Sequence, residues 1–350
     1  GMASAILIIK FILQEFSYDR FHKNAENIYR IYEKDKIPAG SIYNSTTPLP
    51  LAQTLVNDYP AFMRVVSFND MASGIPVKVN QKDINAKGYA TGSDAFKMFD
   101  FNLKAGKPST ILDNPYSAVI TLNAAQRIFG DINPVGQQIS IQKTDFTIAG
   151  VMENLPVNSI FQFDFLISDK IMDVIYPDIL RRWWHGGSYT FVQVFEGQEM
   201  EQLKKELDQI PAKYFPDFLK GRTEFLIQPL KSIHLNSDFI YDMVPSISPL
   251  YLYLLITIAG AVLLIACFNY INLSTATAHQ RSKETGIKKV LGSDRRKMIL
   301  QFMCETTVIS IIALNFAVLI AKLLLPFFNQ LAGKTLDISL MHLPDILSFL

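Results

Sequence analysis

Two stretches of the chain are apolar for long enough to cross a lipid bilayer. No Asp, Glu, Lys or Arg occurs from Met243 to Gln280, and the centre of this stretch, 250–268, is almost wholly apolar. The second stretch, 306–328, is interrupted only by Lys322, which could extend to the membrane interface from near a helix end. About 20 apolar residues span the hydrocarbon as a helix. We therefore predict transmembrane helices at 246–273 and 305–328.

Both ends of the chain carry shorter apolar segments. "ASAILIIKFIL" (3–13) is apolar except for Lys10 but is too short to span a bilayer by itself. Polar residues follow it directly, unlike the small residues of a signal-peptide cleavage site. We predict that 1–15 is the outer part of a first transmembrane helix whose beginning lies outside this sequence. Residues 329–350 are predicted to be an outer loop and the start of a fourth helix.

Residues 16–245 alternate between strand-like and helix-like patterns, which indicates an α+β domain. The expected strands are 26–34, 62–68, 159–168 and 223–230, with hairpins at 75–91, turning near Gln81–Asp83, and at 137–154, turning at Lys143–Thr144. The expected helices are 48–60, 199–215 and a short one within 117–130, where Thr121 or Asn123 is a cap candidate and Gly130 ends the helix. The only cysteines, Cys267 and Cys304, lie in or beside the apolar stretches, so this domain needs an ordinary hydrophobic core.

Positive charge is concentrated between the two apolar stretches. Residues 280–297 hold seven Lys or Arg and two acids, Glu284 and Asp294, which is +5 in a chain of formal charge +1. The other residues therefore sum to −4, and the overall balance argues against a nucleic-acid binder that relies on global charge. Short basic loops stay in the cytoplasm. The loop 274–304 is thus predicted to be cytoplasmic and the domain 16–245 extracytoplasmic.

Apolar residues within this basic loop have helical spacing. Ile287, Val290 and Leu291 fall at i, i+3 and i+4, and Glu284 precedes Lys288 in the favourable order for an ion pair. Gly292 could end a helix in the left-handed conformation, and Ser293 could cap the next helix, beginning at Asp294. The pattern indicates a short, bounded helix across the base of the two membrane helices. Three interpretations compete: a topology signal, an anionic-lipid patch and a protein-docking helix.

The sequence contains no convincing catalytic, cofactor or metal site. "AGKT" (332–335) lacks the upstream glycine of a phosphate loop, because Phe328 holds that position. The five histidines lack the paired spacing of a zinc-protease helix. His185 and Ser188 in "RRWWHGGSY" (181–189) are close in sequence, but a packed aromatic turn is the favoured interpretation, since no third triad partner is visible.

These residues resemble a known family. "RSKETGIKKVLGSDRRKMILQF" (281–302), preceded by "FNYINLSTATA", resembles the cytoplasmic coupling region of MacB/FtsX-like ABC transporter permeases. The family pattern is matched by Arg281, Lys283, Glu284, Gly286, Ile287, Lys289, Leu291 and Gly292. "EFSYDRFHKNAENIYRIY" (15–32) and the segment 120–168 are similar to the extracytoplasmic core of the same family.

The resemblance implies a permease of the inner (plasma) membrane with four transmembrane helices and a porter-like periplasmic domain of mixed sheets and helices. It implies a homodimer or a pairing with a second permease half, and a separate ABC-type ATP-binding subunit that hydrolyses ATP, so that this chain is not itself an enzyme. A periplasmic adaptor or an outer-membrane component is a further partner in such systems. Related permeases serve drug or peptide export, lipoprotein extraction or control of cell-wall hydrolases.

The coupling hypothesis assigns roles to six residues. Ile287, Val290 and Leu291 would insert into the ATP-binding subunit, while Glu284, Lys288 and Lys289 would set its orientation at the rim. The alternative is a membrane-anchored receptor or sensor whose extracytoplasmic domain binds a ligand and whose inner loop contacts a signalling partner. That alternative predicts no dependence on an ATPase.

Overall fold

A computed structural model describes residues 1–60, 62–70, 76–79, 82–184, 186–198, 200–236, 238–292 and 294–337, with the backbone alone at 82, 278–281 and 283–285. The chain forms two compact units. One, the outer unit, is Ser17–Ile247, and the other, the helical unit, combines Gly1–Phe16 with Ser248–Leu350. The segment of the predicted fourth helix, 338–350, lies outside the described residues.

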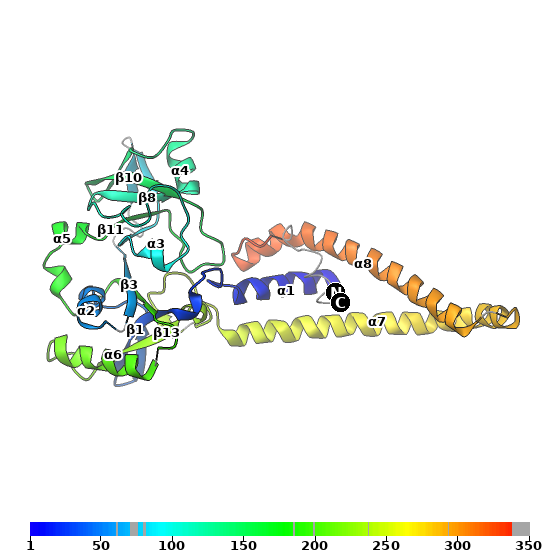
Figure 1. Ribbon diagram of the computed structural model, residues 1–350. Helices are drawn as coiled ribbons and strands as arrows, with labels where there is room; N and C mark the ends of the chain where they lie inside the picture. Colours follow the sequence, from blue (N-terminus) through cyan, green and yellow to red (C-terminus); the bar gives the residue numbers. More distant parts are fainter. Residues whose placement is uncertain are drawn as a thin grey trace. The chain divides into compact units, whose positions relative to one another are not determined.

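The helical unit consists of three described helices, α1 (Met2–Phe16), α7 (Pro249–Val290) and α8 (Arg295–Ala332). Helix α1 packs against both α7 and α8, as Figure 1 shows. In the part of the chain that the structure describes, two helical segments are long and apolar enough to cross a membrane: Pro249–Thr277 and Arg295–Ala332, each with a mean hydropathy of 2.5. Helix α1, at 15 residues, is shorter than a span.

The segment 332–335, whose sequence "AGKT" lacks the upstream glycine of a phosphate loop, lies at the end of α8. Gly333 follows the helix in the left-handed conformation, with φ +61°, which is the usual stop signal of a helix. The Lys334 ammonium lies 3.0 Å from Oε1 of the buried Glu15 at the end of α1. Gly333 and Lys334 therefore have structural roles: one ends a helix and the other neutralises a buried carboxylate.

The outer unit is an α+β domain. Its strands are β1 (Ile28–Ile37), β2 (Gly40–Asn44), β3 (Phe62–Asn69), β4 (Pro76–Val79), β5 (Lys82–Asn85), β6 (Gly88–Thr91), β7 (Leu103–Ala105), β8 (Ser117–Thr121), β9 (Gln138–Ile141), β10 (Thr144–Met152), β11 (Phe165–Ser168), β12 (Ser188–Val194), β13 (Thr223–Pro229) and β14 (Phe239–Ile240). Its α-helices are α2 (Pro50–Asp58), α3 (Ala95–Met98), α4 (Leu122–Phe129), α5 (Ile171–Ile175) and α6 (Met200–Tyr214), with 3-10 turns at Ala25–Asn27, Ile179–Arg181 and Leu230–Ser232.

Hydrogen bonds join the described strands into one mixed sheet in the order β14-β2-β1-β12-β3-β6-β11-β8-β10-β9-β4-β5, while β13 also pairs with β1 and β7 with β10. In the described residues, β3 and β6 pair only at Asn69 and Ala90. One core cluster spans this junction and includes Phe68 of β3 and Leu166 of β11, and each side also has a cluster of its own. Leu51, Leu207 and Phe225 belong to the core under α2 and α6, and Ile120 and Phe146 to that beside α4.

Several local predictions are confirmed in detail. The Thr121 hydroxyl accepts a hydrogen bond from the Ala124 N–H at 3.3 Å and caps α4, and Gly130 ends that helix at φ +61°. The hairpin β9–β10 turns at Gln142–Lys143, one residue before the predicted position. Both turn residues have positive φ, as a type I′ turn requires.

Two other predictions, the strand 159–168 and the hairpin 75–91, are wrong about which residues form strands or pair. Only Phe165–Ser168 of the predicted strand 159–168 is extended, because Ser159 and Ile160 bond to a buried carboxylate instead of a neighbouring strand. In the predicted hairpin 75–91, β4 pairs with β5, whereas β6 pairs with β11 and β3. Strand β5 begins at Lys82, inside the predicted turn, and Gln81 is outside the described residues.

Candidate partner-binding site

The candidate coupling segment is the end of a long helix. Helix α7 runs without a break for 42 residues from Pro249 to Val290, so the separate short helix predicted within 274–304 is not present. No proline lies between 250 and 290, and the two glycines there, Gly260 and Gly286, each cost a helix only about 1 kcal/mol. The polar residues from 274 onward change the surface of the helix but do not interrupt its hydrogen bonds.

The turn between α7 and α8 is short and defined by its caps. The Leu291 N–H donates to the Ile287 carbonyl at 3.0 Å, and Gly292 adopts φ +83°, so the predicted glycine stop is confirmed. The N-cap of α8 is Asp294, whose carboxylate accepts from the Arg296 N–H at 3.3 Å. The helix therefore begins at Arg295, one residue later than predicted, and the predicted cap Ser293 lies outside the described residues.

Three aliphatic side chains are exposed beside the turn between α7 and α8. Ile287, Val290 and Leu291 expose 62%, 88% and 79% of their surface. Charged side chains are costly within the hydrocarbon, so the adjoining basic residues keep this end of the helices at the membrane surface or beyond it. A lone exposed aliphatic residue needs no explanation, but a cluster next to a charged turn is typical of a surface that binds a partner.

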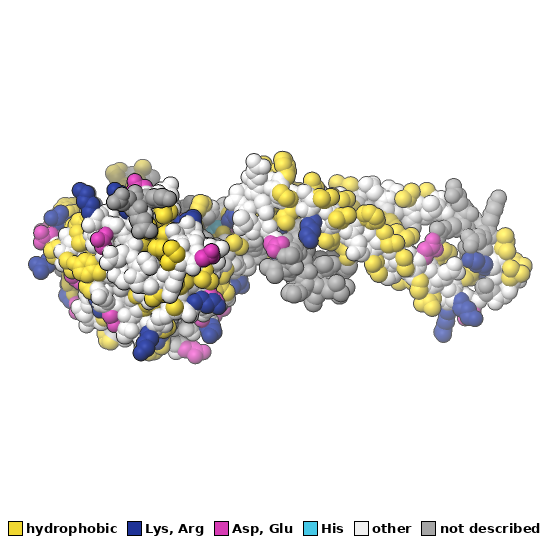
Figure 2. Space-filling view, turned by 90° about the horizontal axis from the view of Figure 1, so that it is seen from above, with side chains coloured by type: hydrophobic (Ala, Val, Ile, Leu, Met, Phe, Trp, Pro, Cys, Tyr) yellow, Lys and Arg dark blue, Asp and Glu magenta, His cyan; other side chains and the backbone are white. Residues whose placement is uncertain are grey.

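Basic residues surround these aliphatic side chains. Lys288 is half-buried and Lys289 exposed in the last turn of α7, where cations interact favourably with the helix dipole. Arg295, Arg296 and Lys297 are exposed in the first turn of α8, where the dipole disfavours cations. The three cations therefore do not serve the stability of α8. Figure 2 shows Lys and Arg side chains gathered at this end of the two helices. Only the backbone of Glu284 is described, so its pairing with Lys288 stays a prediction.

The segments that precede α7 and follow α1 are fastened within the outer unit. The ring of Tyr18 stacks on that of His234 with centroids 3.4 Å apart, and the Ile247 N–H donates to the His234 carbonyl at 2.9 Å. Asp19 is fully buried and accepts from the Ser159 hydroxyl at 2.7 Å and from the Ile160 N–H. Sequence reasoning found Tyr18 and Asp19 only as part of the family-like segment 15–32, without a role.

Burial controls the protonation of the pair Asp19 and His22. It raises the pKa of Asp19 to about 7, although the hydrogen bonds from Ser159 and Ile160 act in the opposite direction. It lowers the pKa of His22 to about 4, opposed by the carboxylate of Asp100. The His22 Nδ1 accepts the Asp100 N–H at 3.1 Å, which suits the neutral imidazole. Both side chains are thus held in their neutral forms near pH 6.

We expect His22 to make the outer unit sensitive to acid. Between its unfolded pKa of 6.5 and its folded pKa of about 4, the unfolded chain binds a proton that the folded chain excludes, so stability falls as pH falls. At about 1.4 kcal/mol per pH unit, the loss is about 2 kcal/mol from pH 6.5 to about pH 5. Unfolding curves of the wild type and His22→Asn should diverge by this amount. Asp19 is present in both proteins, so parallel pH curves would show that His22 does not titrate as described.

The hydrolytic cluster is not assembled in the described residues. Ser188 is fully buried in β12, where its backbone pairs with Thr47, and His185 lies outside the described residues. Among the described residues, no group of three or more His, Cys, Asp or Glu side chains is arranged to hold a metal ion. Buried Ser188 is a strand residue, so it offers no nucleophile to a substrate in solution.

Two span-length apolar helices and an α+β outer domain are the architecture of a membrane-anchored protein. The model of the MacB-like periplasmic core domain matches residues 1–210, and that of the FtsX-like permease C-terminal domain matches 256–350. The chain belongs to the MacB/FtsX-like ABC transporter permease family. It is a membrane protein with an extracytoplasmic domain.

Individual relatives are distant. The chain is 25% identical over 275 residues to the macrolide export ATP-binding/permease protein MacB of Neisseria meningitidis, covering 77% of this chain and 40% of that protein. It is 22% identical to the pyoverdine export ATP-binding/permease protein PvdT of Pseudomonas fluorescens, covering 72% and 37%. The chain thus spans less than half the length of these relatives.

One solved structure supports the fold of the outer unit. A domain described as part of a permease protein from Porphyromonas gingivalis superimposes with a TM-score of 0.53 at 17% identity. The match covers 60% of this chain and 92% of that domain. At this identity the likeness establishes a shared fold and nothing about ligands or partners.

Proposed function

We propose that this chain is a permease subunit of an ABC transporter that transmits ATP-driven motion from a cytoplasmic ATP-binding subunit to its extracytoplasmic domain. The observation that carries the proposal is the exposed cluster of Ile287, Val290 and Leu291 beside a basic turn, at the end of two helices long enough to cross a membrane. Burial of each aliphatic side chain in a partner would contribute about 1.5 to 3 kcal/mol. Glu284, Lys288 and Lys289 would set the partner's orientation at the rim.

In this proposal the turn between α7 and α8 lies in the cytoplasm and the outer unit lies outside the inner membrane. The basic residues of 281–297 support this orientation through the positive-inside rule. The chain would act as a homodimer or beside a second permease half, with a periplasmic adaptor or an outer-membrane component as further partners. Its work would be export, lipoprotein extraction or mechanotransmission without export.

Transmission needs a firm attachment of the membrane helices to the outer unit. The chain enters that unit at Ser17 and leaves it at Ile247, and both points are close in sequence to fixed side chains. Tyr18 stacks on His234, and Asp19 is bonded to 159–160. The residues next to the ends of α1 and α7 are thus packed or hydrogen-bonded within the outer unit. This arrangement favours the transmitter over an anchor that only tethers the domain.

Co-purification tests the proposal against the receptor alternative. The affinity-tagged full-length protein, extracted from its native membrane in mild detergent, is expected to retain an ATP-binding subunit in about equimolar amount. A receptor or sensor would retain a signalling partner without ATPase activity. Recovery of the protein with no ATP-binding subunit after chemical cross-linking in intact cells would contradict the transporter assignment.

A further inference from the structure

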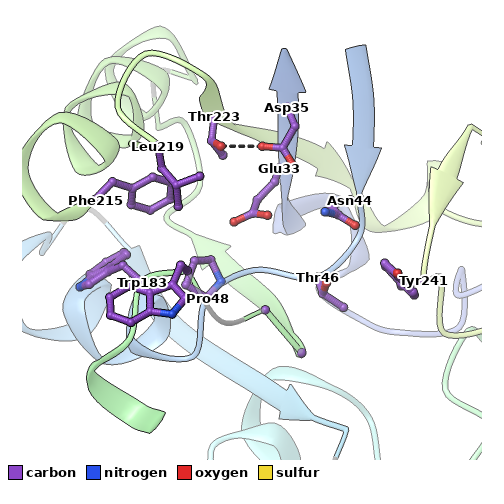
Figure 3. A pocket seen from close by; sticks show the side chains of 13 residues that line it. Glu33, Asp35, Asn44, Thr46, Pro48, Trp183, Phe215, Leu219, Thr223 and Tyr241 are labelled. Atoms are coloured by element: carbon purple, nitrogen blue, oxygen red, sulfur yellow. Dashed lines mark hydrogen bonds between the residues drawn. The ribbon is translucent and has the colours of Figure 1, made fainter. Parts of the chain in front are cut away.

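A cavity of about 430 Å³ lies in the outer unit beside the middle of β1. Strands β1, β2 and β13 contribute to its lining (Figure 3). The other lining residues include Trp183, Trp184, Gly186, Gly187, Phe215, Leu219 and Tyr241. The volume is within the range of pockets that hold drug-sized molecules, about 300 to 1,000 Å³. No function described above uses this cavity, so the inference is independent of the proposed coupling role.

Glu33 and Asp35 of β1 occupy positions at which the alternating pattern of the strand predicts apolar residues. Ile31, Glu33 and Asp35 alternate along β1 and so share one face of the sheet. Ile31 is fully buried in the core under α2 and α6, and the face then continues with the two carboxylates. Glu33 pairs across the sheet with Asn44, and Asp35 with Thr223. The cavity therefore has an acidic floor that continues directly from the hydrophobic core.

These acceptors lack cationic partners in the part of the chain that the structure describes. The Thr223 hydroxyl donates to Asp35 at 2.5 Å, but no described Lys or Arg pairs with Glu33 or Asp35. The neighbouring lysines, Lys34 and Lys36, pair instead with Glu224. The buried Asn44 Oδ1 has no hydrogen-bond partner among the described residues. The Glu33 carboxylate is thus available to a donor that enters the cavity.

The electrostatics of the floor favour a cation. Burial, followed by the proximity of Asp35, raises the pKa of Glu33 to about 8. A positive charge bound between the two carboxylates would oppose both causes, since it compensates the lost hydration and screens their repulsion. Figure 3 shows the Glu33 side chain pointing into the cavity, with Asn44 on the neighbouring strand beside it.

Aromatic side chains form the walls. Trp183 stacks on Tyr214 with ring centroids 4.9 Å apart and contacts the buried Phe215. Trp184 is 54% exposed and Tyr241 is 72% exposed. Tyr241 has a positive φ of 58°, and its carbonyl is held by the hydroxyls of Ser45 and Tyr189. Aromatic faces attract organic cations and provide flat surfaces for an apolar body.

We infer that this cavity binds a small organic cation with an apolar body. Its ammonium group would donate to Glu33, with Asp35 as a second negative charge nearby. Its apolar body would lie against Trp183 and Phe215. Charge-assisted hydrogen bonds to a buried carboxylate give the ammonium group its selectivity over a neutral analogue.

Intrinsic fluorescence makes the test specific to this cavity, because the only two tryptophans of the chain, Trp183 and Trp184, both line it. The full-length protein in detergent is titrated at about pH 8, close to the Glu33 pKa, with 4-phenylbutylammonium and with its neutral analogue 4-phenylbutan-1-ol. We expect the ammonium to bind at least about tenfold more tightly, since hydrogen bonds to charged groups contribute about 1.5–3 kcal/mol.

Variants connect the preference to the acidic floor. Glu33→Gln keeps the size of the side chain and should reduce the preference to about twofold or less, while affinity for the alcohol stays unchanged and reports an intact cavity. The matched control Glu224→Gln removes a carboxylate that pairs with Lys36 outside the cavity, and should keep the full preference. Equal affinity of the wild type for both probes would overturn the inference, whatever the variants do. A preference that persists in Glu33→Gln would also overturn it.

Discussion

Replacing Ile287 and Leu291 together by aspartate is expected to abolish coupling between the permease and its ATP-binding subunit, while the protein still inserts into the membrane. Both side chains are largely exposed in the described structure, so the change leaves no cavity in the fold. Loss of two buried aliphatic contacts costs about 3 to 6 kcal/mol of docking energy, and two desolvated carboxylates add to that cost. This corresponds to at least about a hundredfold loss of affinity.

The measurement is ATPase activity of the co-reconstituted subunits, together with their co-purification. The matched control is the double variant Ile287→Leu with Leu291→Ile, which exchanges the two side chains between the positions. It keeps the apolar area and should keep most of the coupling. Membrane fractionation shows whether the aspartate variant is inserted. Wild-type coupling in the inserted aspartate variant would remove these residues from the interface and would favour the topology-signal interpretation.

Replacing Asp242 by alanine is expected to destabilise the outer unit by about 3–5 kcal/mol, because it leaves a buried guanidinium without its counter-ion. Arg30 is 1% exposed, forms an ion pair with Asp242 and donates to the Gln228 side chain at 2.7 Å. Its guanidinium also lies 4.5 Å from the centre of the Phe239 ring. Asp242 precedes α7 by a few residues, so this ion pair anchors the segment that leads to the membrane helix.

Denaturant unfolding followed by tryptophan fluorescence measures the effect in the outer unit. Replacing both partners, as Arg30→Met with Asp242→Leu, should recover most of the lost stability because no buried charge remains. Lys231→Ala breaks the exposed ion pair with Glu26 and serves as the control, with little change in the unfolding midpoint. If Asp242→Ala unfolds at the same denaturant concentration as the wild type, the prediction is wrong, and the Arg30 guanidinium must be hydrated or bonded to another acceptor in the variant.

Prediction from sequence succeeded where the signal is local. Thr121 caps the start of α4 and Gly130 ends the helix. Both were predictable because a hydroxyl cap and a glycine of positive φ act within one turn of backbone. Gly292 ends α7 for the same reason. The expected helix 199–215 was found as Met200–Tyr214, since its apolar spacing repeats over four turns.

Prediction failed where distant residues decide the structure. Strand β12 was missed because polar Ser188, Thr190 and Gln193 break its apolar pattern. In the structure all three are buried, and two have side-chain partners from other segments: the Thr190 hydroxyl meets that of Thr47 at 2.7 Å, and Gln193 accepts from Arg64 at 2.8 Å. Sequence spacing cannot show that a partner more than a hundred residues away will satisfy a buried polar group.

The sequence by itself determined the two span-length apolar segments, the basic stretch between them, the α+β character of the outer domain and the family. Each depends on composition, periodicity or a contiguous motif, which the chain carries before it folds. Only the tertiary structure decided that Tyr18 stacks on His234. It also placed Glu33 and Asp35 at the floor of an aromatic cavity. The acidic floor of the cavity arises when strands far apart in sequence pair, because pairing determines which side chains share a face and which buried groups lack a partner.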